Sequence, residues 1–108
     1  METLTDWANA LKSGDPNNVT DLYGEDALLL ATLEAKPLEG PEQIFPYFVN
    51  LAKKDGLHVL WVDEPQEVAD GVFAGLYNFV WNGGSVEARY TFVVEDGEII
   101  HHHSSEMP

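Results

Sequence analysis

Cysteine is missing from this sequence, basic residues are few, and no apolar run is long enough to span a membrane. Without cysteine there is no disulfide framework and no thiolate to serve as nucleophile or metal ligand. Five basic residues against nineteen acidic ones give a formal net charge of -14, which disfavours binding to nucleic acid or to an anionic membrane surface. We therefore expect neither nucleic acid nor a membrane as a partner. No basic and apolar leader is visible, so we expect a cytoplasmic protein.

Length and composition set the size of the fold. The chain has 108 residues, of which 44% are hydrophobic and 11% aromatic. This is enough apolar material for one core and too little chain for two. Because no internal repeat or low-complexity tract interrupts the sequence, we expect residues 1–108 to form a single domain.

Helical spacing of apolar residues dominates the first half of the chain. Leu4, Trp7 and Leu11 recur at this spacing, and Asp15 followed by Pro16 is a typical helix start. Pro46 conflicts with the third helical pattern, so that helix either bends there or starts later. The expected elements are a helix ending near 13, a helix from 15 to about 24, a buried strand over 27–33, a loop over 36–40 and a helix from 41 to about 54.

Strand patterns fill the second half. Asp70-Gly71, Asn82-Gly83-Gly84 and Asp96-Gly97 are hairpin signals, because these residues tolerate positive φ. They separate segments in which apolar and polar residues alternate, and Pro65 marks an edge or a bulge in the first segment. The expected strands cover about 57–69, 72–81, 85–94 and 98–105. Helices followed by such a meander predict an α+β fold of order ααβαββββ, with a curved antiparallel sheet wrapped over the third helix.

The last expected strand carries three consecutive histidines followed by two serines. Side chains alternate between the faces of a strand, so a regular strand places His101, His103 and Ser105 on the face of Ile99. Imidazoles and a hydroxyl inside an apolar core need hydrogen-bonding partners. This strand is therefore where we look for a functional site.

Simpler readings of the histidine run stay open. It can be a tag remnant, although the residues on both sides are not needed in a tag. It can be a solvated strand end. It can bind a metal, but only His101 and His103 share a face, Glu106 points to the other one, and a catalytic zinc usually needs three protein ligands. We therefore expect no metal and no other cofactor.

The element order and several local motifs resemble the NTF2-like superfamily along essentially the whole chain. The motifs are Trp7 in the first helix, Ser-Gly-Asp-Pro at 13–16, Leu-Tyr at 22–23 and a loop ending in Glu39-Gly40. The resemblance implies a cone-shaped fold with a pocket between sheet and helix. It implies no particular function, because one fold can host many.

A narrower resemblance is to the iota-class carbonic anhydrases, which are relatives of the calcium/calmodulin-dependent kinase II association domain. It rests on Leu-Leu-Ala-Thr at 29–32, Tyr-Phe at 47–48, Ala-Arg-Tyr-Thr-Phe-Val at 88–93 and the ending His-His-His-Ser-Ser-Glu-Met-Pro. The resemblance implies a lyase that hydrates CO2 to bicarbonate without a metal. By motif position its site residues are Thr32, Tyr47, His103 and Ser105. A neutral imidazole can accept a proton from water, so we expect His103 to be the base.

Two other function classes remain. The same fold can be a non-catalytic association or small-ligand-binding module. A ketosteroid-isomerase-like enzyme or a dehydratase would need a carboxylate or a His-Asp pair in the pocket, and no such group stands out. We also expect a homodimer or larger homo-oligomer, because Thr91 and Val93 lie on a sheet face that the third helix cannot cover.

Overall fold

Three helices occupy the first half of the chain in the computed structural model, which describes residues 2–32 and 34–107. They are α1 (Glu2–Ser13), α2 (Pro16–Thr20) and α3 (Gly40–Leu51). Asp15 caps α2, because its carboxylate accepts a hydrogen bond from the Asn17 backbone N–H at 2.9 Å. None of the described helices combines the length and the apolar character needed to cross a bilayer.

The expected helix boundaries hold for α1 and shift for the other two helices. α2 stops at Thr20 instead of continuing to Gly24, because the chain is already extended from Tyr23 onward. α3 begins at Gly40, so it does not start after Pro46, and it ends at Leu51, before the two lysines expected in its last turn. Pro46 is exposed, so water can satisfy the carbonyl group that it leaves without a donor.

One seven-stranded sheet holds the remaining elements in the order β2-β1-β7-β6-β5-β3, with β4 also paired to β5. Neighbouring strands are antiparallel except for β1 and β7, which run parallel. The strands are β1 (Tyr23–Leu30), β2 (Leu38–Glu39), β3 (His58–Trp61), β4 (Gln66–Ala69), β5 (Val72–Trp81), β6 (Gly84–Glu95) and β7 (Glu98–Glu106).

The expected meander is present with two local differences. The segment over 57–69 is two short strands, β3 and β4, separated by the stretch that contains Pro65. The expected loop over 36–40 contains β2, which pairs with β1. At the turn between β6 and β7, Asp96 and Gly97 both have positive φ, as the hairpin signal predicted.

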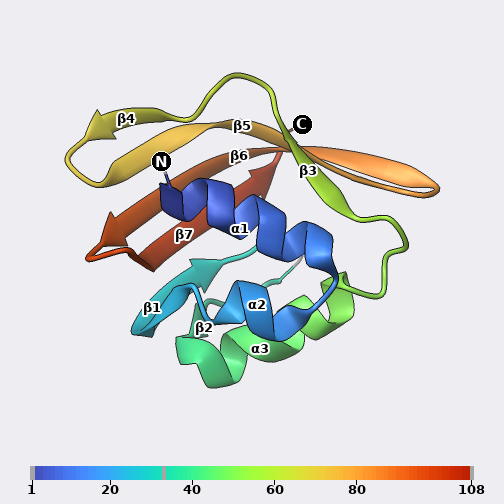
Figure 1. Ribbon diagram of the computed structural model, residues 1–108, viewed down its shortest axis with the longest axis horizontal. Coiled ribbons are helices and arrows are strands. Elements are labelled where there is room, and N and C mark those ends of the chain that lie inside the picture. The colour runs from blue at the N-terminus through green and yellow to red at the C-terminus, as the bar shows by residue number, and fades with distance from the viewer. Residues whose placement is uncertain (1, 33, 108) are drawn as a thin grey trace.

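The helices pack against the sheet and create one apolar core (Figure 1). Trp7 of α1 is fully buried and contacts the rings of Tyr77 on β5, Phe92 on β6 and His102 on β7. α3 packs against β1 and α2. This arrangement of a curved sheet with helices on its inner side confirms the α+β fold class.

A β-bulge in β7 decides which of its side chains face this core. Ile99 pairs with Val94 and His101 pairs with Val93, so Ile100 is an extra residue with no partner of its own on β6. Because of this extra residue, the alternation of side chains between the two faces of β7 is reversed beyond it. The His102 side chain therefore lies on the same buried face as Ile99.

The expected face assignment of β7 was therefore wrong for two of the proposed site residues. Ile99 is 0% exposed, Ile100 36% and His102 2%. His103 and Ser105 are half-buried on the opposite face, and the side chains that face the core are those of His102 and Ser104.

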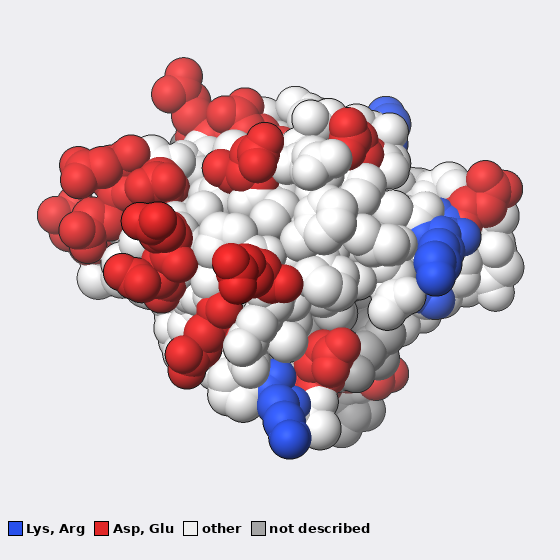
Figure 2. Space-filling model, turned by 90° about the horizontal axis from the view of Figure 1, so that it is seen from below, with Lys and Arg blue, Asp and Glu red and all other residues white. Residues whose placement is uncertain are grey.

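Acidic side chains gather at one end of the molecule (Figure 2). This is the end at which β4 turns into β5 and β6 turns into β7, and the exposed residues there include Glu67, Asp70, Glu95, Asp96 and Glu98. The Lys and Arg side chains visible in the same view lie outside that end. The negative net charge is thus concentrated on part of the surface.

Candidate functional site

His102 lies at the centre of a buried polar network. Its Nδ1 atom is 2.7 Å from the Tyr23 hydroxyl and its Nε2 atom is 3.0 Å from the Tyr77 hydroxyl. The Trp7 indole N–H donates to the Tyr23 oxygen at 3.1 Å. The imidazole also stacks on the Phe92 ring, with 3.9 Å between the ring centroids. Both ring nitrogens are therefore engaged within the protein.

Burial keeps this imidazole neutral. Loss of hydration is the main cause that lowers the pKa of His102 to about 3, and electrostatic repulsion from His101 and His103 contributes to the same shift. Burial likewise raises the pKa of Tyr23 and of Tyr77 above the ordinary tyrosine value. At neutral pH the network consists of uncharged groups, so it offers hydrogen bonds and no base.

Thr32 and Ser104 form a second polar contact, which is partly buried. Their side-chain oxygens are 2.6 Å apart, and Thr32 lies two residues beyond the end of β1, while Ser104 lies on the neighbouring β7. The Ser104 hydroxyl also lowers the pKa of Tyr77 against the effect of burial. The Thr32 pair therefore lies beside the histidine network.

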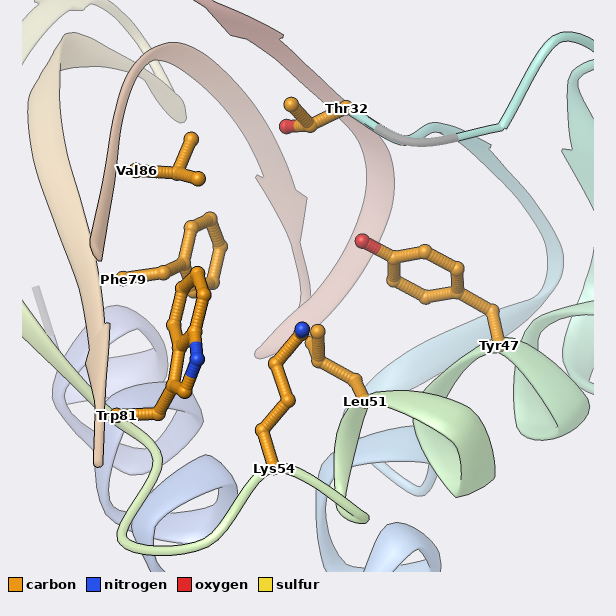
Figure 3. Close-up of a pocket in the computed structure, with 7 residues that line it drawn as sticks. All are labelled: Thr32, Tyr47, Leu51, Lys54, Phe79, Trp81 and Val86. Carbon is orange, nitrogen blue, oxygen red and sulfur yellow. The ribbon is translucent and has the colours of Figure 1, made fainter. Parts of the chain in front are cut away.

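A small cavity lies in front of Thr32 (Figure 3). The Thr32 and Tyr47 hydroxyls reach the cavity from different elements, and both point toward its interior. The volume is about 20 Å³, and a single water needs about 10–15 Å³. The remaining lining residues are Leu51, Lys54, Phe79, Trp81 and Val86. An apolar hollow with two hydroxyls and one amine suits a small polar molecule.

Lys54 and Tyr47, together with Leu51, line both this cavity and an outer hollow of about 290 Å³. The Lys54 ammonium lies over the Trp81 ring, 4.3 Å from its centroid, which is cation–π geometry. Glu34 and Asn50 line the outer hollow. Burial and, to a smaller extent, the Glu34 carboxylate raise the pKa of Tyr47 to about 12. The Lys54 side chain thus lies where the two hollows adjoin.

The structure brings together only part of the predicted site. Thr32 and Tyr47 line the cavity, whereas His103 and Ser105 lie on the other face of β7. Sequence reasoning missed His102 and Ser104, because nothing local in the sequence marks the bulge at Ile100. Among residues 2–32 and 34–107, no three histidine or carboxylate side chains are grouped so that they could hold a metal ion.

The fold and the pocket between sheet and helices define an NTF2-like protein. A Xanthomonas campestris protein, provisionally described as a calcium/calmodulin dependent protein kinase II association domain, is 37% identical, with a TM-score of 0.82 over 97% of this chain and 83% of that one. The chain therefore belongs to the family of calcium/calmodulin dependent protein kinase II association domains within the NTF2-like fold.

More distant structures share the fold alone. A ketosteroid isomerase-like protein from Catenulispora acidiphila, solved with trimethylamine, is 19% identical with a TM-score of 0.77, covering 95% of this chain and 83% of that one. An NTF2-like protein of unknown function from Cytophaga hutchinsonii is 18% identical with a TM-score of 0.75, covering 99% and 88%. No family model and no curated protein matches the sequence.

Proposed function

We propose that this protein catalyses the reversible hydration of CO2 to bicarbonate in the cavity between Thr32 and Tyr47. The observation that supports the proposal is the convergence of two hydroxyls, one of them backed by Ser104, on a small and mostly apolar hollow. An apolar wall suits CO2, and hydroxyl donors suit the oxygen atoms on which negative charge develops. Within the part of the chain that the structure describes, the lining has no imidazole or carboxylate, the usual ligands of zinc in a protein without cysteine, so we propose a reaction without a metal.

In the proposed reaction, a water oxygen forms a bond to the carbon of CO2 while one O–H bond of that water breaks. Thr32 and Tyr47 donate hydrogen bonds to the CO2 oxygens, which gain charge in the transition state. The Lys54 ammonium at the mouth of the cavity then favours the bicarbonate anion.

The proton needs an acceptor, and the buried histidine does not provide one. His102 has both ring nitrogens engaged and a pKa lowered to about 3, and His103 lies on the opposite face of the sheet. The Glu34 carboxylate lines the outer hollow with Tyr47, so we propose Glu34 as the group that passes the proton to bulk water.

A stopped-flow assay of CO2 hydration on chelator-treated protein tests the proposal. Thr32→Val keeps the shape of the side chain and removes the hydroxyl, so turnover should fall about 10²-fold, as for the loss of one oxyanion donor. Thr91→Val is the matched control, because Thr91 lies on β6 opposite His103, on the outer face of the sheet. Hydration no faster than the uncatalysed rate, or equal losses in the two variants, would refute the proposed activity.

Self-association is a second candidate function. It is favoured by the kinship with a protein described as an association domain and by the outer face of the sheet, where Thr91, Val93 and His103 are only half-buried. Such a face suits a second copy of the chain. Light scattering coupled to size exclusion tests this, and a monomeric mass at micromolar concentration would contradict it.

A further inference from the structure

The Lys54 ammonium lies against an aromatic ring at the cavity. It is 4.3 Å from the centroid of the Trp81 ring, and Figure 3 shows the two side chains facing each other on one side of the cavity. Lys54 lines both the cavity and the outer hollow. A lysine side chain has many rotamers, so holding its charge in one place requires a specific partner.

The backbone segments that carry Lys54 and Trp81 are bonded to each other one residue further along. The Asn82 backbone N–H donates to the Asp55 carbonyl oxygen at 2.8 Å, and the Asn82 side-chain amide donates to the Asp55 carboxylate at 2.8 Å. Lys54 precedes Asp55 in the turn after α3, and Trp81 precedes Asn82 at the end of β5. The two side chains therefore start from fixed points, and the orientation of the Trp81 ring decides where the ammonium meets it.

Gly84 leaves the space in which the Trp81 ring lies. The two residues pair with each other across β5 and β6. A Cβ atom at Gly84 would lie 2.8 Å from the ring atom Cζ2 and 3.0 Å from Cε2, so the ring would have to move. Gly83 has a φ of 108°, whereas Gly84 is outside the left-handed region. A side chain is therefore excluded at Gly84 by the ring and not by the backbone.

Two carboxylates compete with the ring for the ammonium. Glu34 lines the outer hollow with Lys54, and Asp55 lines a third hollow of about 360 Å³ that Lys54 also borders. Contact with either carboxylate would neutralise the positive charge and turn it away from the Thr32 and Tyr47 hydroxyls. An aromatic ring attracts an ammonium without neutralising it, so the charge stays available to an anion.

We infer that Trp81 is a positioning residue: in the space that Gly84 leaves, it holds the Lys54 ammonium at the cavity, where the ammonium and the two hydroxyls bind a small planar oxyanion. Bicarbonate as that oxyanion rests on the proposed function, whereas the position of Lys54 rests on the contacts alone. Because Trp81 also lines the cavity, its effect through Lys54 has to be separated from its own contact with the ligand.

NMR of the lysine side chains tests the position of Lys54 without a ligand. Protons above an aromatic ring are shielded, so the Lys54 methylene next to the ammonium should resonate upfield of those of the other lysines. Gly84→Ala and Trp81→Leu should both return it toward the position of the other lysines. A wild-type Lys54 resonance that coincides with theirs would overturn the inference.

A titration with sodium formate at constant ionic strength tests the ligand. Formate is a small planar oxyanion that does not exchange with CO2. Gly84→Ala should weaken its binding about twofold, at the lower end of what a cation–π contact contributes at an exposed site. Gly83→Ala is the matched control, because it strains the same turn while an added Cβ would meet no atom within 4 Å. This control should lose stability and keep its affinity for formate.

Three outcomes of this titration would overturn the inference. They are no binding of formate to the wild-type protein, unchanged affinity in Gly84→Ala, and equal losses of affinity in Gly84→Ala and Gly83→Ala. Formate binding with the expected pattern in a protein that does not hydrate CO2 would refute the proposed function and leave this inference standing.

A double-mutant cycle shows whether Trp81 acts through Lys54. Lys54→Met and Trp81→Leu should each weaken formate binding about threefold, and the double variant should also lose about threefold. A loss of about ninefold in the double variant would show that Trp81 acts on the ligand independently, which would overturn its positioning role. Trp81→Phe keeps an aromatic face, so it should bind formate more tightly than Trp81→Leu. Equal affinities of these two variants would contradict the cation–π contact as the cause.

Discussion

The buried imidazole of His102 predicts a specific loss of stability as the pH falls. Its pKa is lowered to about 3 in the folded protein, against an ordinary value of about 6.5. Between these values the unfolded chain binds a proton that the folded protein does not bind, so the free energy of unfolding decreases as the pH falls. The neutral histidine contributes its full stability above about pH 6.5, and the contribution is lost progressively toward about pH 3.

The magnitude follows from the two pKa values. At about 1.4 kcal/mol for each pH unit, the full loss is about 5 kcal/mol. Free carboxyl side chains titrate at about pH 4, so the interval from pH 7 to pH 5 isolates the histidines best, and the loss from His102 there is about 2 kcal/mol. This is a large fraction of the 5–15 kcal/mol that is typical of a folded domain.

Urea unfolding of the wild-type protein and of His102→Gln at pH 7 and pH 5 measures this effect. The glutamine does not titrate, so the variant should be less stable at pH 7 but should lose about 2 kcal/mol less between the two pH values. Contributions from carboxylates and from the other histidines occur in both proteins and cancel in the difference.

Equal pH dependence of the two proteins would refute this reasoning. If His102→Gln does not fold, an NMR titration of His102 in the wild-type protein gives the same answer. A His102 resonance that titrates near pH 6 would then contradict the lowered pKa.

Three further predictions concern activity and backbone strain. Ser104→Ala should lower the rate of CO2 hydration about tenfold, since it removes the partner that holds Thr32, whereas Ser105→Ala on the outer face should leave the rate unchanged. Lys54→Met should raise the KM for bicarbonate about threefold in the dehydration direction, because a partly exposed cation contributes modestly; an unchanged KM would remove Lys54 from the site. Gly71→Ala should destabilise by about 2 kcal/mol more than Gly97→Ala. Both glycines have positive φ, but only at Gly71 would a Cβ meet a carbonyl oxygen at 2.5 Å, and equal losses in chemical denaturation would contradict this.

The fold could be predicted because the signals that determine it are local. Helical spacing of apolar residues located α1 and α3, the Asp15-Pro16 pair located α2, and turn residues with positive φ located the hairpins. Each of these signals involves neighbouring residues and a short list of allowed conformations. The pairing of β1 with β7 joins distant parts of the chain, and no local residue pattern announces it.

Only part of the candidate site could be predicted from the sequence. Thr32 and Tyr47, which the resemblance assigned by motif position, both line the cavity. His103 and Ser105 were placed on the wrong face, because the count along β7 passes through a bulge. A bulge depends on how two strands pair, so the sequence of one strand does not determine it.

The bulge in β7 has a further consequence because the strand contains three consecutive histidines followed by two serines. A shift of one residue in pairing exchanges the two faces of a strand, and in most sequences this would expose the core and bury unrelated side chains. In β7, a shift of one residue would replace His102 and Ser104 on the core-facing side of the strand with His101, His103 and Ser105. The core receives a histidine followed two positions later by a serine in either case. Inserting or deleting one residue at this point therefore changes the register while the interior keeps the same chemical groups.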